Sequence, residues 1–193
     1  MNTQQKSLLE ELKKDEWSHS KEWFEYWLGY SGPDHWQFWI GLALLIVPLI
    51  AFFLLINKRN ALQLGFYGYN VHVFFTYIDL YGANNGYWFY PYKVLPILPS
   101  SFALDVSFVP VFFSFIYQWS QAKQKNYYVW SIILSAVFAF VLKPLFVAIG
   151  MFEFGKGANY LHLFIGYVIV ALTAKWMTNL FLYFEKKAKV QHS

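Results

Sequence analysis

Five long apolar stretches dominate the chain, and short polar segments separate them. Each is close to the roughly 20 residues that a helix needs to cross a bilayer. The stretches are continuous rather than alternating, which favours helices over the roughly ten-residue strands of a membrane barrel. They cover about residues 36–56, 62–81, 102–119, 127–149 and 160–184. The pattern therefore predicts an all-α integral membrane bundle of five transmembrane helices, which together form one domain over residues 36–184.

The two ends of the chain are polar and lie outside this bundle. Residues 1–35 contain four large apolar side chains at roughly helical spacing: Trp17, Phe24, Trp27 and Leu28. This predicts an N-terminal amphipathic helix over about residues 5–30, either resting on lipid headgroups or packed as a cap over the bundle. The periodicity favours the first arrangement. Residues 185–193 form a short basic tail.

Composition supports a lipid bilayer as the partner and excludes several other classes. Of the 193 residues, 58% are hydrophobic and 13% are charged, against about 25% charged in soluble domains. Aromatic residues make up 23%, which suits a protein with two membrane interfaces. The net charge of +4 comes from scattered residues rather than from a basic folded face, so a nucleic-acid partner is not expected. The chain contains no cysteine, which excludes disulfides and thiolate sites.

The positions of the basic residues predict the orientation of the bundle. With five spans, the first and third connections and the C-terminal tail fall on the same side. These three segments hold most of the flanking basic residues: Lys58, Arg59, Lys123, Lys125, Lys186, Lys187 and Lys189. By the positive-inside rule, this side faces the cytoplasm. The C-terminus is therefore expected in the cytoplasm, and the N-terminus with its amphipathic segment outside.

One long connection and its flanks resemble a known family. The run "YIDLYGANNGYWFYPYKVLPILPSSFALDVSFVP", with "FVLKPLFVAIG" later, is similar to small uncharacterised multi-spanning membrane proteins of spore-forming Gram-positive bacteria. The matching positions are Asp79, Trp88, Tyr90, Pro91, Tyr92, Pro99, Asp105, Pro110, Pro144, Leu145, Phe146 and Gly150. The chain departs from the family at Lys143, where many members would carry an acid. The resemblance implies a bacterial plasma membrane and no known activity.

Three ionisable residues fall in the outer half of the predicted spans. Asp79 lies near the end of the second span, Asp105 near the start of the third, and Lys143 about six residues before the end of the fourth. A charge at the centre of a bilayer costs about 2.5–3.5 kcal/mol, so such side chains usually face the bundle interior and pair. Two carboxylates and one ammonium leave one negative charge, which would attract a proton or a cation.

Two prolines lie close to these charges. Because proline has no backbone N–H, Pro110 and Pro144 are expected to free the carbonyls of Val106 and Phe140. Further polar side chains are expected nearby, either on the same helix faces or in the long loop. The candidate pocket comprises Asp79, Asp105, Lys143, His72, Thr76, Tyr90, Tyr92 and His162. The histidines lack metal-ligand spacing, and the sequence identifies no catalytic residue and no cofactor.

Three functional hypotheses fit these features. The leading one is a non-enzymatic membrane protein that binds or passes a small solute, ion or lipid at an outer-leaflet polar pocket. The second is a membrane-embedded enzyme acting on a lipid or isoprenoid, with Asp79 and Asp105 as an acid–base pair tuned by Lys143. The third is a structural or partner-binding membrane protein, in which the buried charges only lock the helices together.

Overall fold

Helices account for 78% of the chain, and the only sheet within residues 1–191, which the structure describes, is a pair of two-residue strands. The structure is a computed structural model. Its α-helices are α1 (Thr3–Tyr30), α2 (Trp36–Leu55), α3 (Ala61–Asn84), α4 (Val109–Ala122), α5 (Tyr127–Val137), α6 (Lys143–Ala148) and α7 (Tyr160–Gln191). The expectation of an all-helical fold is confirmed.

The shorter elements connect these helices. A 3₁₀ turn, η1 (Lys58–Asn60), precedes α3, and two π-helical turns, η2 (Leu104–Phe108) and η3 (Phe138–Leu142), lie within longer helices. The strands β1 (Trp88–Phe89) and β2 (Glu153–Phe154) pair antiparallel, with Trp88 opposite Phe154. They tie the long loop after α3 (residues 85–103) to the connection before α7 (residues 149–159).

Each π-helical turn comes just before a proline. In η2 the N–H of Val109 donates to the carbonyl of Leu104, one residue before Pro110. In η3 the N–H of Lys143 donates to the carbonyl of Phe138, one residue before Pro144. Such wide turns absorb the missing proline donor without breaking the helix. The chain therefore forms one continuous helix through η2–α4 and another through α5–η3–α6, and each contains one π-helical turn.

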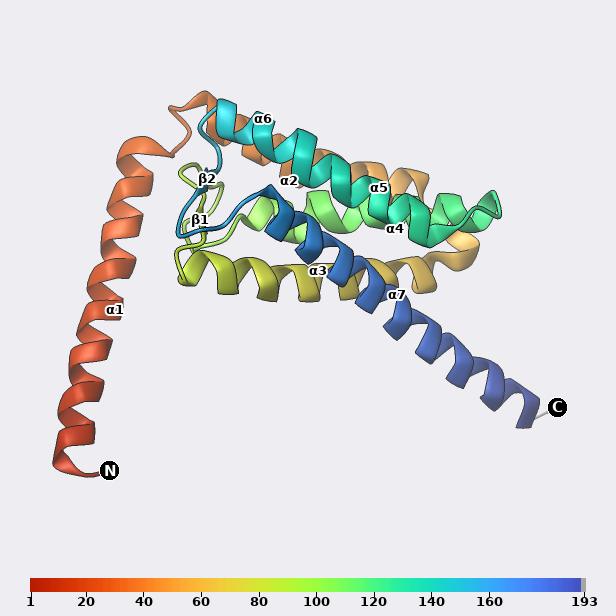
Figure 1. The fold of residues 1–193 in the computed structure, drawn as a ribbon, viewed down its shortest axis with the longest axis horizontal. Helices are drawn as coiled ribbons and strands as arrows, with labels where there is room; N and C mark the ends of the chain where they lie inside the picture. The colour runs from red at the N-terminus through yellow and green to blue at the C-terminus, as the bar shows by residue number, and fades with distance from the viewer. Residues whose placement is uncertain (192–193) are drawn as a thin grey trace.

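Three helices of the described chain are long and apolar enough to cross a membrane: Trp36–Leu55, Tyr127–Ala148 and Tyr160–Val190. Figure 1 shows α3 and η2–α4 running in the same bundle beside them. These two are less apolar because they carry polar side chains on buried faces, including Asn70, Asp79 and Asp105. The long apolar helices support a membrane protein.

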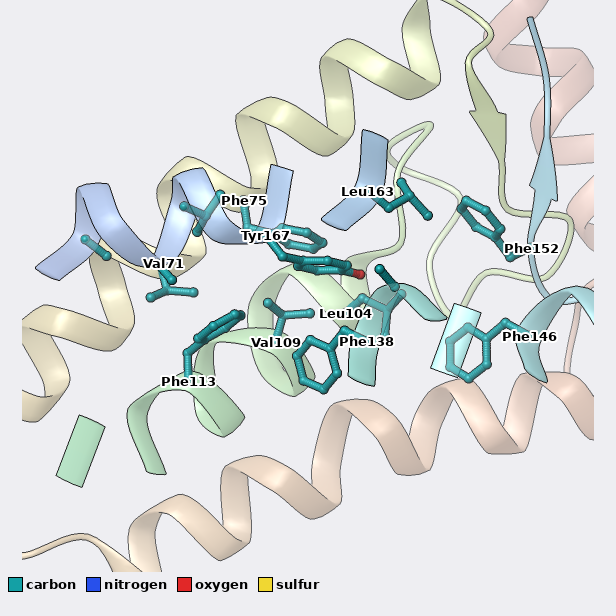
Figure 2. Close-up of a cluster of buried hydrophobic side chains, with 14 of the residues drawn as sticks. Val71, Phe75, Leu104, Val109, Phe113, Phe138, Phe146, Phe152, Leu163 and Tyr167 are labelled. Carbon is teal, nitrogen blue, oxygen red and sulfur yellow. The ribbon is translucent and has the colours of Figure 1, made fainter. Parts of the chain in front are cut away.

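Aromatic side chains fill the centre of the bundle (Figure 2). Phe75 of α3 stacks on Tyr167 of α7, with ring centroids 5.2 Å apart and planes 13° from parallel. Phe138 of η3 contacts the same Tyr167 at 5.5 Å and Phe113 of α4 at 5.8 Å. This packing joins α3, α4, η3 and α7, and it fixes the depths of the polar groups that lie beside it.

Helix α1 crosses one end of the bundle, and only its C-terminal part contacts it (Figure 1). The indole Nε1 of Trp27 donates to the backbone carbonyl of Lys93 at 2.8 Å, and the Lys93 N–H donates to the Ser31 hydroxyl at 2.7 Å. Of the four apolar residues expected on one stripe, Trp27 faces the loop, while Trp17, Phe24 and Leu28 are exposed. Helix α7 continues through residues 185–191, where the sequence suggested a tail.

Candidate functional site

Asp79, Asp105 and Lys143 come together in the interior, at the end of the bundle that α1 crosses. Asp79 lies on α3, Asp105 in η2 and Lys143 at the first position of α6. Their side chains are almost completely buried, with residue exposures of 3%, 1% and 1%. With Tyr90 from the long loop, they form what we call the acid–lysine cluster. The two π-helical turns position two of its members, because Asp105 lies inside η2 and Lys143 directly follows η3.

The long loop supplies the hydrogen-bond donors for Asp79. Its Oδ1 accepts from the Trp88 indole and from the Tyr90 hydroxyl, both at 2.8 Å, and its Oδ2 accepts from the backbone N–H of Ser101 at 3.4 Å. Gly82 makes this approach feasible, because a Cβ at this position would overlap the Trp88 ring. The loop therefore folds back over α3 and closes the cluster.

Tyr90 stands between the buried base and the first acid. Lys143 Nζ donates to the Tyr90 hydroxyl at 3.0 Å and lies 3.8 Å from the centre of the Phe152 ring. Within the described residues, no ion pair shorter than 4.0 Å links Lys143 to either aspartate. The direct pairing expected from the sequence is thus replaced by a bridge from Lys143 through Tyr90 to Asp79. Burial raises the pKa of the Tyr90 phenol well above its usual value, and the charge of Asp79 adds to this effect, so the phenol keeps the proton that it donates.

Asp105 is incompletely satisfied. Its Oδ2 accepts from the Ser100 hydroxyl at 2.7 Å, but its buried Oδ1 has no hydrogen-bond partner in the described structure. Asp105 interacts electrostatically with both Asp79 and Lys143. A buried carboxylate oxygen without a donor carries a desolvation cost that a bound proton or cation would relieve.

His72 and Thr76 support the backbone of η2 rather than the acid pair. Val109 donates to Leu104 and Pro110 has no N–H, so the Asp105 carbonyl lacks both donors that an α- or π-helix would offer. The His72 Nδ1 lies 2.8 Å from this carbonyl oxygen, and the Thr76 hydroxyl lies 3.3 Å from the same nitrogen. The carbonyl with a substitute donor is thus that of Asp105, one residue before the Val106 carbonyl expected from the sequence.

Tyr92 and His162 lie outside the acid–lysine cluster. The Tyr92 ring packs beside His35, with ring centroids 6.2 Å apart. His162 is exposed, and its Nδ1 lies 3.0 Å from the Asn159 side-chain oxygen. His162 still lines the cavity beside Asp79 and Lys143. Of the eight candidate residues, the structure brings four into the cluster, two against the η2 segment and one to the rim of the cluster, and it leaves Tyr92 outside.

The cavity at the cluster is small. Its volume is about 20 Å³, and Asp79, Tyr90, Lys143 and Tyr167 contribute to its walls. A site needs roughly 10–15 Å³ to hold one water molecule, so the cavity has room for one water or one small ion. A solute or a lipid headgroup does not fit in this conformation. No group of three or more His, Asp or Glu residues that could hold a metal is found among residues 1–191.

Sequence reasoning missed three contributors to the cluster: Trp88, Ser100 and Phe152. One signal for Trp88 was available, because Trp88 and Tyr90 are two residues apart and side chains at this spacing share a face in extended chain. Both donate to the same oxygen of Asp79. No comparable signal points to Ser100 or Phe152, whose positions depend on how two irregular connections fold over the bundle.

Comparison with known proteins gives no relative. No protein-family model matches the chain, and neither a curated protein nor a solved structure matches it. Any function assigned to the chain therefore depends on the geometry and charge of the site itself.

Proposed function

We propose that the chain is a five-span membrane protein that binds one small cation, in the first place a proton, at the acid–lysine cluster. The observation that carries this proposal is the buried Oδ1 of Asp105, which lacks a hydrogen-bond donor beside a second buried acid. The sequence alone suggested a small solute, an ion or a lipid as the ligand. The small cavity at the cluster favours an ion among these three. The membrane is the plasma membrane of a bacterium, as the family resemblance implies.

The proposed five spans add α3 and η2–α4 to the three long apolar helices. Helix α3 has 24 residues, and η2 with α4 has 5 and 14 residues. At 1.5 Å per residue these helices are about 36 Å and 28 Å long, which matches the roughly 30 Å of a hydrocarbon core. An odd number of spans also gathers the basic segments around Lys58, Lys123 and Lys186 on one side, which supports a cytoplasmic C-terminus and an outside N-terminus.

The count of charges favours a bound proton. If all three side chains were ionised, Asp79 and Asp105 would carry two negative charges against one positive charge on Lys143. A net buried charge is costly, because each uncompensated ion loses its hydration without a partner. One proton shared by the two carboxyl groups makes the cluster neutral and gives the Asp105 Oδ1 a hydrogen to bind. A small monovalent cation in the cavity beside Asp79 would also balance the charge, but Asp105 does not line that cavity, so the Asp105 Oδ1 would stay without a partner.

The closed cavity gives less support to the enzyme hypothesis. A general acid or base must come within hydrogen-bond reach of its substrate, but both carboxyl groups are buried beneath the long loop. Lipid chemistry at these aspartates would need that loop to move. The structural hypothesis, in which the buried charges only hold the helices together, requires no bound cation. Detection of a proton bound to the cluster would therefore favour the proposal over the structural hypothesis.

Infrared spectroscopy of the folded protein tests the proposal. We expect the carboxylic-acid C=O stretch of a protonated aspartate at neutral pH, and we expect it to disappear as the pH is raised. Either Asp105→Asn or Asp79→Asn removes the surplus charge, so either variant that folds should lose the band. The control is Asp15→Asn, which alters an exposed acid on α1 and should leave the band unchanged. A folded wild-type protein without the band, in a buffer free of small metal cations, would show that the cluster holds no proton, and the proposal would fail.

A further inference from the structure

A second and much larger hollow lies at the opposite end of the bundle. It has a volume of about 620 Å³ and lies between the start of α3 and the last turns of α7. Its walls include Arg59, Gln63, Phe66, Thr178, Phe181 and Leu182. This volume is within the 300–1,000 Å³ range of ligand sites. We call it the α3–α7 wedge.

The wedge exists because α7 separates from α3 toward its C-terminal end (Figure 1). Near the start of α7, small residues such as Gly166 allow the two helices to pack closely. A Cβ added to Gly166 would lie 3.8 Å from the Ile78 side chain of α3. Farther along, Phe66 and Phe181 hold the two helices apart, with ring centroids 5.0 Å apart. An apolar gap between two membrane helices is filled by hydrocarbon rather than by water, because water would find few partners there.

The rim of the wedge is positively charged. Arg59 is exposed and makes no ion pair within the described residues, and Lys58 precedes it. Glu185, the acid at the rim, is paired with Lys189 at 2.5 Å. The first turn of α3 lies beside Arg59, and the side chain of Asn60, the residue before it, makes no capping bond. The N–H of Ala61 donates to the Lys58 carbonyl, so the N–H groups after it are the ones that a headgroup could approach. Basic pockets between membrane helices on the cytoplasmic side suit anionic headgroups.

We propose that the α3–α7 wedge binds one anionic phospholipid. Its phosphate lies at Arg59 and the start of α3, and an acyl chain packs along the apolar wall that Phe66, Phe181 and Leu182 form. The inference rests on the five-span arrangement proposed above, which places this end of the bundle at the cytoplasmic interface. It is independent of any ion at the acid–lysine cluster, which lies at the other end.

Native mass spectrometry tests this inference. The full chain is purified in detergent and titrated with phosphatidylglycerol or with zwitterionic phosphatidylcholine. We expect one phosphatidylglycerol to bind in preference to phosphatidylcholine. Removing one basic residue near a headgroup costs about 1 kcal/mol, so Arg59→Gln should weaken phosphatidylglycerol binding about fivefold. The matched control is Lys123→Gln, which removes a charge from the other basic connection and does not line the wedge.

A second variant fills the apolar part of the wedge. Leu182→Trp should reduce binding of the acyl chain whatever the headgroup. Equal retention of both lipids by the wild type, or a dimer of the chain in place of the lipid adduct, would overturn the proposal. The membrane arrangement is checked separately by labelling single cysteines introduced at Asn60 and Asn85, because the chain has no cysteine of its own. If the two cysteines are labelled from opposite sides of the membrane but the protein shows no preference for phosphatidylglycerol, the five-span arrangement stands and only the inference about the wedge is refuted.

Discussion

The hydroxyl group of Tyr90 determines how a buried lysine and a buried aspartate coexist without touching. It accepts from Lys143 and donates to Asp79, so each charged group gains a charge-assisted hydrogen bond. Such bonds are stronger than those between neutral groups. Tyr90 can hold this position because β1 and the Trp88 indole anchor its loop segment against α3.

Tyr90→Phe should therefore destabilise the folded protein markedly. The substitution keeps the ring but leaves two buried charged groups each short of one hydrogen bond, so we expect the free energy of unfolding to fall by about 2–4 kcal/mol. Chemical denaturation in detergent measures this change. Tyr87→Phe is the matched control, because the Tyr87 hydroxyl makes no hydrogen bond within the described residues. Equal stabilities of the two variants would contradict the bridging role.

The sequence was informative about the charged residues and much less so about their partners. Asp79, Asp105 and Lys143 stand out because they interrupt apolar runs, and the cost of burying them predicts convergence. Their indirect connection through Tyr90 was not predictable, since it depends on the path of a proline-rich loop. His72 and Thr76 share a helix with Asp79 but support the Asp105 backbone, which spacing along one helix cannot reveal.

At the scale of elements, the two π-helical turns allow Pro110 and Pro144 to lie inside continuous helices. Each wide turn lets the helix continue past a missing N–H and shifts the side chains that follow. In η2 the unsatisfied Asp105 carbonyl is met by His72 from α3, which couples the two helices. The sequence predicted free carbonyls at both prolines but not the π-helical geometry.

This coupling predicts that His72 and Pro110 are energetically linked. His72→Ala removes the donor to a buried carbonyl and should cost about 1–3 kcal/mol of unfolding free energy. In a Pro110→Ala background the backbone regains an N–H, so His72→Ala should cost less there. Unfolding measurements on the two single variants and the double variant give the interaction energy. Additive costs would show that His72 does not replace the missing backbone donor.

The attachment of α1 depends on one lysine in the long loop. Lys93 Nζ donates to the Leu98 carbonyl at 3.0 Å and lies 4.3 Å from the centre of the Trp23 ring. Burial lowers the pKa of Lys93 to about 8, and the charge of Asp79 opposes this shift only in part. Detachment of α1 would expose Lys93 and restore its ordinary pKa of 10.5.

The attachment of α1 should therefore strengthen as the pH rises. Between pH 8 and 10.5 the detached state binds more protons at Lys93 than the attached state does, so raising the pH favours attachment. Below pH 8 both states are protonated, and the dependence disappears. Fluorescence anisotropy of a dye at Ser18→Cys reports the order of α1 and should rise over this range. Adding Lys93→Met should abolish the rise, and an unchanged slope in that variant would assign the effect to another group.

At the scale of the whole molecule, the two candidate sites, the acid–lysine cluster and the α3–α7 wedge, lie at opposite ends of the bundle. The acid–lysine cluster is closed beneath α1, the long loop and the strand pair, whereas the opposite end is open, basic and wedge-shaped. The helical fold followed from apolar run lengths alone. The position of α1 and the divergence of α7 did not, because both depend on contacts between distant segments that periodicity does not encode.

The central claim is that Lys143 and Asp79 neutralise one another across the bundle through Tyr90. The most direct measurement is the unfolding free energy of Lys143→Met, of Asp79→Asn and of the double variant, in the same detergent. Lys143→Met leaves the buried carboxylates without their counter-charge, which costs about 3–5 kcal/mol, whereas Asp79→Asn removes the bridge through Tyr90 and leaves Asp105 as the acid that balances Lys143. We predict that the double variant loses at least about 1 kcal/mol less than the sum of the two single losses. Additivity within about 0.5 kcal/mol would contradict the claim, because the two charges would then not sense each other.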